Sequence, residues 1–350
     1  MSFSRPAENL VLVTGGAGYI GSALVARLLE TGATVRVFDP LLYGAGALAD
    51  FHDQSRFSLI AGNPVRVEDV QCAVAGVTQV VHLGAIVGDP ACALDPAFTL
   101  AANVESTRLL VEAAAAIGVR RFIFASTCSV YGAGDHELDE AAPLEPQSLY
   151  AESKVTGERI AFGSPAIVPV VLRFGTVFGA SRRARFDLVV NLLAAKAAAG
   201  EPIRIFGGEQ WRPFVHVEDI VTAIGLALAA DERVASGEVF NVGSARENRR
   251  LAELGDMIGE LVPGTRVEVD HSSVDRRDYR ADFSKIARQL RFVPSWSLRD
   301  GIQQLLRQLH DDASLDFRDA AYANDRALTR LRSIQGELGF GFGFDRITSG

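Results

Sequence analysis

The sequence is poor in cysteine and contains no cluster of metal-ligating side chains. Its three cysteines, Cys72, Cys92 and Cys128, are too few for a dense disulfide framework and lack the spacing of a metal site. We therefore expect free thiols, which are typical of a reducing compartment. The sequence predicts no bound metal.

Positive charge and long apolar runs are also scarce. Lysine and arginine number 35 against 43 aspartates and glutamates, which gives a formal net charge of −8. This balance disfavours a nucleic-acid partner, because such proteins normally carry a basic face. No apolar run has the length of a transmembrane helix, and residues 1–9 contain no signal-peptide core. We therefore expect no membrane partner and a cytoplasmic location.

The remaining composition is that of a folded protein of about two domains. Of the 350 residues, 48% are hydrophobic and 22% are charged, so the apolar surface is large enough to offset the conformational entropy of the chain. Short β-rich runs alternate with segments of helical periodicity. This alternation predicts an α/β fold in which helices cover both faces of a parallel sheet. The predicted strands of this sheet are residues 10–13, 34–38, 79–83, 122–125, 168–174 and 238–242.

Apolar periodicity predicts the helices between these strands. We expect His82, inside a strand, to be a core residue, and Asp219 of the segment His216-Val-Glu-Asp219 to cap a helix. A strand and loop at 201–212 and a strand at 266–269 are also expected. The predicted helices are residues 20–30, 98–117, 150–162, 185–199 and 217–230, with a final helix at 298–310.

A glycine-rich loop lies between the first strand and the first helix. Gly16, Gly18 and Gly21 satisfy G-x-G-x-x-G, a pattern that lets a pyrophosphate approach the backbone at a helix N-terminus. Asp39 ends the next strand, where its carboxylate could accept hydrogen bonds from both ribose hydroxyls of an adenosine. A 2′-phosphate would be repelled there. The loop and Asp39 together therefore predict a dinucleotide site that prefers NAD to NADP.

A tyrosine and a lysine four residues apart indicate a second functional element. Tyr150 and Lys154 would share one face of a helix. A lysine ammonium beside a tyrosine favours the phenolate, which can take a proton from a sugar hydroxyl while hydride leaves the same carbon. This spacing is common by chance. A hydroxyl of the strand-end segment 126–132 could hold the same substrate oxygen.

At this point the chain resembles the extended short-chain dehydrogenase/reductase family, in its nucleotide-sugar epimerase and dehydratase branch. The resemblance runs from about Leu10 to about Gly301 and depends on Asp39 and on the segments TGGAGYIG, STCSVYG, YAESK, LRFGTVFG and RPFVHVEDI. It implies a Rossmann-like doubly wound parallel sheet with a smaller mixed α/β C-terminal substrate domain. The implied division is an NAD-binding domain of residues 1–179 and 214–242, a nucleotide-sugar domain of residues 180–213 and 243–335, and a loosely ordered tail of residues 336–350.

The resemblance also implies roles for individual residues. Tyr150 would be the catalytic acid/base, Lys154 its partner and a ligand of the nicotinamide ribose, and Thr127 the catalytic hydroxyl. Asn63 would lie near the adenine and Asn103 near the active site. The residues implied at the NAD site are Gly15, Gly18, Tyr19, Ile20, Gly21, Asp39, Asn63, Ala85, Asn103 and Lys154.

The nucleotide-sugar side of the site is implied by position only. Arginine suits a diphosphate because its planar fork can bind two oxygens. We favour Arg277 over Arg276, which we expect to be a surface charge. The family resemblance also suggests a homodimer. The residues implied at the substrate are Cys128, Ser129, Thr176, Asn191, Arg212 and Arg277.

The expected reaction is an epimerisation of a nucleotide sugar. Family dehydratases usually carry an Asp-Glu pair where this chain has Cys128 and Ser129, and family decarboxylases usually have a glutamate at the position of Ser129. An epimerase oxidises a sugar hydroxyl to a ketone with NAD and then returns hydride to the other face. Three alternatives remain open: a dehydratase, an oxidoreductase that releases its cofactor each cycle, and a non-catalytic NAD-binding regulatory protein. Cys92 or Cys128 could act as an acid/base, but both are more simply small buried thiols.

Overall fold

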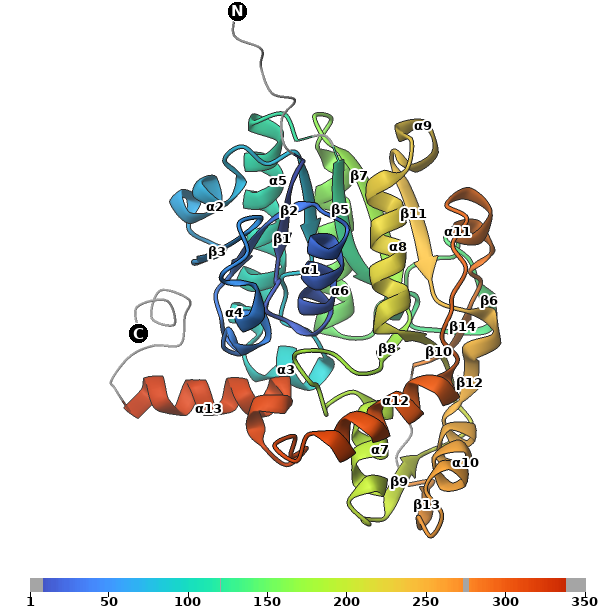
Figure 1. Ribbon diagram of the computed structural model, residues 1–350. Coiled ribbons are helices and arrows are strands. Elements are labelled where there is room, and N and C mark those ends of the chain that lie inside the picture. The colour runs from blue at the N-terminus through green and yellow to red at the C-terminus, as the bar shows by residue number, and fades with distance from the viewer. Residues whose placement is uncertain (1–8, 120, 273–276, 338–350) are drawn as a thin grey trace, which may run out of the picture.

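A seven-stranded parallel sheet forms the centre of the larger part of the molecule (Figure 1). The computed structural model describes residues 9–119, 121–272 and 277–337. Arg276 and most of the expected tail (338–350) thus lie outside the described residues. The strand order is β3-β2-β1-β4-β5-β7-β11, so the order reverses between β1 and β4. The strands are β1 Leu10–Thr14, β2 Thr34–Asp39, β3 Phe57–Ala61, β4 Gln79–His82, β5 Arg121–Thr127, β7 Val168–Phe174 and β11 Glu238–Val242.

Helices cover both faces of this sheet because its strands are apolar on both sides. In β1, Val11 and Val13 pack into one hydrophobic cluster with helices α1 and α8, while Leu12 packs into another with α2 and α5. Successive residues of a strand point to opposite faces, so the two clusters are two layers. The doubly wound fold predicted from the sequence is confirmed. The flanking helices are α1 Tyr19–Glu30, α2 Val67–Val74, α5 Ser106–Ala116, α6 Leu149–Gly163 and α8 Val217–Ala229.

The helix expected at 98–117 is interrupted by a π-helical turn. A short helix, α4 (Pro96–Leu100), is capped by Asp95 and followed by the π-turn Ala101–Glu105, after which α5 begins. Such turns insert one extra residue and often occur at functional sites. Here the turn contains Asn103, whose side chain holds an active-site loop, as described below.

A smaller lobe is built from short strands and three helices around its own apolar core. The core includes Val190, Ile205, Phe214, Leu254 and Ile302. The strands of the large sheet all come from residues 1–179 and 214–242, so we retain the predicted division into two domains as a proposal. The strands outside the large sheet are β6 Ala133–Leu138, β8 Thr176–Phe178, β9 Ile203–Phe206, β10 Trp211–His216, β12 Asn248–Arg250, β13 Val267–Asp270 and β14 Asp278–Ala281. The lobe's helices are α7 Val189–Ala198, α10 Leu251–Leu261 and α12 Leu298–Asp311.

Three expectations about helices were wrong. The helix expected from residue 185 begins at Val189, because Arg185 pairs with Asp187 and residues two apart do not face each other on a helix. A further helix, α13, follows the one expected to be last. His216, and not Asp219, caps α8. The helices not yet given are α3 Asp89–Leu94, α9 Glu232–Ala235, α11 Ser284–Gln289 and α13 Asn324–Glu337.

The contacts of the two side chains explain why His216, and not Asp219, caps α8. The backbone N–H of Glu218 donates to Nδ1 of His216 at 3.2 Å. The carboxylate of Asp219 is instead occupied by the backbone and hydroxyl of Ser295, at 2.8 and 2.9 Å, and by the backbone of Trp296. Asp219 therefore ties the segment before α12 to α8.

Helix α13 lies against α3 and runs along the lower edge of the larger domain (Figure 1). Leu328 of α13 is buried in a cluster with Leu42, Ile86 and Cys92, and the backbone of Leu94 accepts a hydrogen bond from Arg332 at 2.8 Å. This helix therefore borders the active-site region although it lies far from it in sequence. Within the described residues, no helix is long and apolar enough to cross a membrane.

Candidate active site

The glycine loop follows β1, at the point where the strand order of the sheet reverses. Gly15 has φ +70°, and a Cβ there would lie 2.8 Å from Cα of Gly84, which follows β4. A Cβ on Gly21 would lie 2.1 Å from the carbonyl oxygen of Gly15. Both positions require glycine so that the loops after β1 and β4 can approach each other and helix α1 can start close to them. In parallel sheets such a crevice is the usual ligand site.

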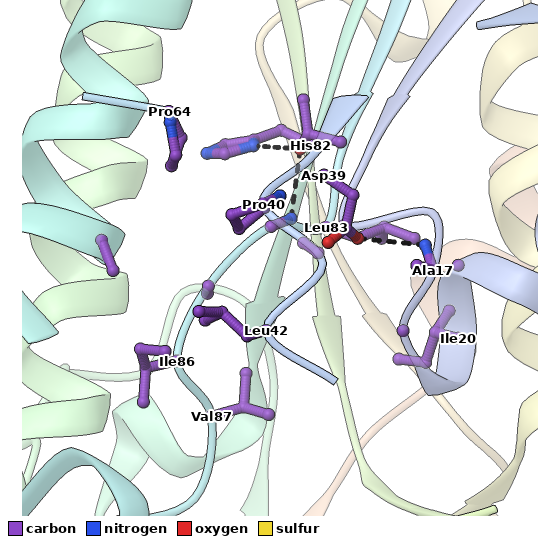
Figure 2. Close-up of a pocket in the computed structure, with 18 of the residues that line it drawn as sticks. Ala17, Ile20, Asp39, Pro40, Leu42, Pro64, His82, Leu83, Ile86 and Val87 are labelled. Atoms are coloured by element: carbon purple, nitrogen blue, oxygen red, sulfur yellow. Dashed lines mark hydrogen bonds between the residues drawn. The ribbon is translucent and has the colours of Figure 1, made fainter. Parts of the chain in front are cut away.

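A cavity opens at this crevice, and we call it the switch-point cavity (Figure 2). The glycine loop forms part of its wall, together with the end of β2, the loop after β4 and helix α6. Among the residues predicted to bind NAD, those that line it are Gly15, Gly18, Tyr19, Ile20, Gly21, Asp39, Ala85 and Lys154.

Asp39 is fixed beside the glycine loop by two backbone groups. Its Oδ2 accepts from the N–H of Ala17 at 3.0 Å (Figure 2), and its Oδ1 accepts from the N–H of Leu41 at 2.8 Å. Burial raises the pKa of this carboxyl, and the two N–H groups oppose that rise. A carboxylate oxygen can accept more than one hydrogen bond, so both oxygens remain able to bind ribose hydroxyls.

His82 joins β1, β4 and α5 beneath the cavity. Its Nδ1 lies 2.6 Å from the Thr14 hydroxyl and its Nε2 lies 2.9 Å from the Thr107 hydroxyl. Burial lowers the pKa of His82 to about 3, so the ring is neutral at physiological pH. His82 is buried, as the sequence predicted. His82 also lines the cavity. Its partner Thr14 in turn accepts from the backbone of Gly84 at 3.1 Å.

The three residues predicted to be catalytic lie together. Tyr150 and Lys154 occupy successive turns of α6, which Ser148 caps, and both line the switch-point cavity. Thr127, at the end of β5, lies near enough to Tyr150 for its hydroxyl to oppose the rise in the pKa of the phenol. The Lys154 ammonium donates to the carbonyl oxygen of Ala125 at 2.9 Å. The Tyr150 phenol and the Lys154 ammonium are therefore at the cavity wall, with the Thr127 hydroxyl near the phenol.

The electrostatics of Tyr150 differ in one respect from the prediction. Burial raises the pKa of Tyr150, the Cys92 thiol adds to that rise, and Arg185 and the Thr127 hydroxyl oppose it. Arg185 therefore supplies a positive charge that favours the phenolate, a role predicted for Lys154. Burial lowers the pKa of Lys154 to about 8, and its ammonium is directed toward Ala125.

Asn103 holds the loop after β4 against the catalytic helix. Its Oδ1 accepts from the N–H of Ile86 at 2.7 Å, and its Nδ2 donates to the carbonyl of Ile86 at 2.9 Å and to the hydroxyl of Ser153 at 3.0 Å. Its side chain is thus used to position other residues. Asn63 is also buried, and its Oδ1 accepts from the backbone of Val65. Its neighbour Pro64 lines the cavity.

A buried ion pair between Arg173 and Glu158 connects α6 to the large sheet. Nε and Nη2 of Arg173 bind the two carboxylate oxygens of Glu158 at 2.9 and 2.7 Å. Ser126 donates to the same carboxylate at 2.5 Å, and Arg173 also donates to the Tyr131 hydroxyl at 2.9 Å. Each charged residue of this pair is only 4% exposed. The network joins α6 to β5 and β7.

A second cavity of about 900 Å³ lies between the larger domain and the smaller lobe, and we call it the inter-lobe cavity. Arg185 lines both cavities. Although the chain is acidic overall, the described residues that line the inter-lobe cavity carry more positive than negative charge, which favours an anionic ligand. The basic ones are Arg185, Lys196, Arg204, Arg212, Arg277, Arg318 and Arg326, and the acidic ones are Asp89, Asp187 and Asp325.

Three of the six residues predicted to bind substrate line this cavity. They are Thr176, Arg212 and Arg277. Arg277 forms an ion pair with Asp89 at 3.2 Å, and its carbonyl oxygen accepts from Arg212. The two arginines are therefore held side by side at the cavity wall.

The structure places the other three elsewhere. Cys128 is fully buried, and its thiol donates to the carbonyl of Arg173 at 3.3 Å, so it is a core residue and not a substrate contact. Asn191 is buried too. Its Oδ1 accepts from Gly179 and its Nδ2 donates to the carbonyl of Arg185, so it positions the chain around Arg185. The Ser129 hydroxyl lies 3.5 Å from that of Tyr279.

Several residues that border the cavities were not selected from the sequence. Arg183, Tyr43 and Asn324 line the switch-point cavity, and Arg185 and Asp89 line the inter-lobe cavity. The sequence offered a signal for Arg183 and Arg185, because three arginines fall within residues 181–185 of an acidic chain. Asn324 had none, because it lies in a polar segment without a motif.

A match to a known family agrees with this geometry. Residues 11–243 match the NAD dependent epimerase/dehydratase family, and the chain belongs to that family. It is 31% identical over 310 residues to the uncharacterized UDP-glucose epimerase YtcB of Bacillus subtilis, covering 83% of this chain and 95% of the relative. It is 30% identical over 312 residues to a dTDP-glucose 4,6-dehydratase of Actinoplanes sp., covering 84% and 95%.

Solved structures show the same architecture. The crystal structure of UDP-glucuronic acid 4-epimerase from Bacillus cereus, in complex with UDP-glucuronic acid and NAD, is similar with a TM-score of 0.78 and 27% identity. The similarity covers 86% of this chain and 99% of that one. This chain is therefore an NAD-dependent enzyme of the epimerase/dehydratase class.

The switch-point cavity fits NAD. Its glycines leave room where added Cβ atoms would collide with backbone, and the fixed Asp39 carboxylate can accept hydrogen bonds from ribose hydroxyls. Lys154 and Tyr150 line the same cavity. The glycine loop and Asp39 would hold the adenosine and diphosphate, and Lys154 would lie at the nicotinamide ribose.

Replacing Asp39 by serine should narrow the preference for NAD over NADP. The carboxylate accepts hydrogen bonds from ribose and repels a 2′-phosphate, so Asp39→Ser should weaken NAD binding roughly 10- to 100-fold and weaken NADP binding less. Calorimetric dissociation constants for both cofactors test this, with Asp53→Ser as a control at an exposed carboxylate. Tighter binding of NADP than of NAD by the unmodified protein would contradict the role of Asp39.

Proposed function

We propose that the enzyme is an NAD-dependent nucleotide-sugar epimerase. The site has the groups needed to oxidise a hydroxyl, but it lacks the acid pair that a dehydratase would carry beside them. This observation supports the proposal most. Tyr150 and Lys154 line the switch-point cavity, and the Thr127 hydroxyl is near enough to Tyr150 to influence its pKa. Cys128 and Ser129 stand where related dehydratases usually carry acids, and Cys128 is packed into the core.

The chain's own groups suffice for the proton-transfer half of the reaction. The sugar would enter through the inter-lobe cavity, with the reacting hydroxyl within reach of Tyr150 and Thr127. Bound NAD would supply the hydride acceptor for the sugar carbon and the hydride donor for its re-reduction. Tyr150 takes the hydroxyl proton and later restores it, Thr127 holds the oxygen, and Arg185 favours the ionised phenol.

Two of the three acids that line the inter-lobe cavity, Asp89 and Asp187, form ion pairs. Asp89 binds Arg277 at 3.2 Å, and Asp187 binds Arg185 through two bonds at 3.0 and 2.8 Å. Burial alone would raise the pKa of Asp187, but Arg185 outweighs burial and holds it below its usual value. An ionised, paired carboxylate is a poor proton donor for expelling a hydroxyl, which disfavours dehydration.

The charge of the inter-lobe cavity supports a nucleoside diphosphate as the anionic part of the substrate. Arg212 and Arg277 are held together at its wall by the hydrogen bond between them, and a guanidinium can bind phosphate oxygens bidentately. The similar Bacillus cereus structure contains UDP-glucuronic acid, and the Bacillus subtilis relative is described as a UDP-glucose epimerase. A UDP-sugar is therefore the substrate that we favour.

The reaction can be identified by proton NMR in D₂O. The protein should convert UDP-glucose or UDP-glucuronic acid into a mixture with one new set of sugar signals. Because hydride is held on the cofactor and returned, no deuterium should enter the sugar and no reduced cofactor should accumulate. Loss of water with deuterium uptake would show a dehydratase. Accumulation of reduced cofactor would show an oxidoreductase, and no reaction with either sugar would leave the epimerase proposal unsupported.

Removing Arg212 should weaken UDP binding without changing NAD binding. Loss of a charge-assisted hydrogen bond is worth roughly 1.5–3 kcal/mol, so Arg212→Ala should raise the dissociation constant of UDP at least about tenfold. The effect should persist partly at high salt, since a buried pair is screened less than an exposed one. Calorimetry measures both constants, and Arg250→Ala removes a more exposed arginine as a control. If UDP does not bind the unmodified protein, the nucleotide-sugar proposal fails.

A further inference from the structure

The segment that connects the large sheet to the smaller lobe passes along the switch-point cavity. Ser181 donates to the carbonyl of Tyr19 at 2.6 Å, and Arg182 binds Asp50 at 2.6 Å. These two contacts fix the segment to α1 and to the chain after β2. As a result, the next arginines, Arg183 and Arg185, are buried at the cavity wall.

The two arginines differ in how their charge is balanced. Arg185 is neutralised by Asp187 through two hydrogen bonds. Arg183 donates from Nη2 to the side-chain oxygen of Asn324 at 2.9 Å, which is a neutral partner. Its guanidinium lies 4.0 Å from the centroid of the Tyr43 ring. Burial, with Arg185 nearby, lowers the pKa of Arg183 to about 10, which is the expected response of a poorly compensated cation.

Two buried donors face this cavity without an acceptor among the described residues. They are Nε of Arg183, whose side chain belongs to a residue only 8% exposed, and the hydroxyl of Tyr43. An unsatisfied buried donor is costly, and more so when it belongs to a charged group. The two come from segments 140 positions apart, yet they are in contact. What both lack is the same thing, an acceptor oxygen.

The position of Arg183 along the cavity identifies which part of a dinucleotide it would meet. Ser181 is bound to Tyr19, the first residue of α1, so Arg183 follows two residues after a contact with the N-terminus of that helix. Arg183 and Tyr43 line the same cavity as Gly15 and Gly18 of the glycine loop. A diphosphate binds at such a loop and helix N-terminus, so it would lie within reach of these two donors.

We propose that Arg183 and Tyr43 bind the diphosphate of NAD, with Arg183 supplying the charge that the backbone of the glycine loop lacks. Binding completes the hydrogen bonds of both donors and neutralises the buried cation. Arg183 belongs to the segment that leads to the smaller lobe, and Asn324 of α13 binds its side chain. The bound cofactor is therefore also contacted by a residue from outside the nucleotide-binding sheet. The contacts of Arg183 and Tyr43 with the diphosphate keep the cofactor bound between turnovers.

The test compares ligands that differ only in the diphosphate. Dissociation constants of ADP and adenosine are measured by calorimetry on the full chain stripped of cofactor, for the unmodified protein, Arg183→Met and Tyr43→Phe. We expect Arg183→Met to weaken ADP roughly 10- to 100-fold and Tyr43→Phe to weaken it several-fold, with adenosine unchanged. Arg233→Met is the control, since its side chain is exposed and paired with Asp231. It should leave both constants unchanged.

Thermal unfolding gives an independent readout that does not need turnover. Without ligand, Arg183→Met should melt at the same temperature as the unmodified protein or higher, because a buried unbalanced charge is removed. With NAD, its rise in melting temperature should be smaller. Equal weakening of ADP and adenosine would show a purely structural role and overturn the proposal. Unchanged ADP binding would overturn it as well. If Arg183→Met does not fold, Tyr43→Phe, which keeps the ring, decides by the same criteria.

Discussion

Tyr150→Phe should lower kcat by roughly 10²–10⁴-fold and leave the affinity for NAD unchanged. The substitution removes the one oxygen that can take the proton of the sugar hydroxyl and keeps the ring that packs beside Cys92. Thr127 cannot replace it, because a threonine hydroxyl is a far weaker acid and its oxygen already accepts from the backbone of Ser129. The rate is measured by NMR with the UDP-sugar that the unmodified protein converts.

Tyr322→Phe is the matched control for that measurement. Its ring packs against Phe186, away from the catalytic end of the switch-point cavity. The control should turn over normally, and both variants should bind NAD as the unmodified protein does. Near-normal turnover by Tyr150→Phe would remove Tyr150 from the mechanism.

Removing Arg173 alone should destabilise the fold by about 3–5 kcal/mol, because it leaves Glu158 buried and unpaired. Arg173 contributes two short bonds to that carboxylate and one to Tyr131. Chemical denaturation of Arg173→Met measures the loss. As a comparison, Arg27→Met breaks a half-exposed pair with Glu218, and it should cost less than about 1 kcal/mol.

The double variant Arg173→Met with Glu158→Gln separates two explanations of such a loss. If the cost comes from a stranded charge, removing the charge as well should recover much of the stability, since replacing both members of a buried pair is often close to neutral. No recovery would mean that shape and packing, and not charge, dominate at this site. Since Glu158 lies one turn beyond Lys154, these variants should also be assayed for turnover.

The parts of the site that could be predicted from the sequence are those encoded in short segments. The glycine loop is a strand, a turn and a helix start in succession, and the Tyr150–Lys154 spacing is one helical turn. Asp39 ends the strand after the loop. In each case the local geometry of one or two neighbouring elements fixes where the side chain lies. A sequence pattern contains that information.

Other features depend on which side chains meet across the fold. Arg183 and Asn324 are 141 residues apart, and no local pattern relates them. Helix α13 was missed because its residues are mostly polar and it is stabilised by docking on α3. Cys128 shows a different limit. Its position in a motif was recognised, but the chain turns into a 3-10 helix at Cys128, and its thiol is buried against the backbone of Arg173.

The long chain separations at Asn324 have a consequence for how the protein folds. Its side chain binds Arg183 and the carbonyl of Val87, which lie 141 and 237 residues earlier in the chain. Closing such long loops is entropically costly, so these contacts should form after the helices and the sheet. An early folding species would then have its secondary structure but would lack the contacts of Asn324 that position Arg183 at the cofactor site. During refolding, the far-UV circular dichroism should recover before NAD is captured, and a single common rate for both signals would contradict this order of events.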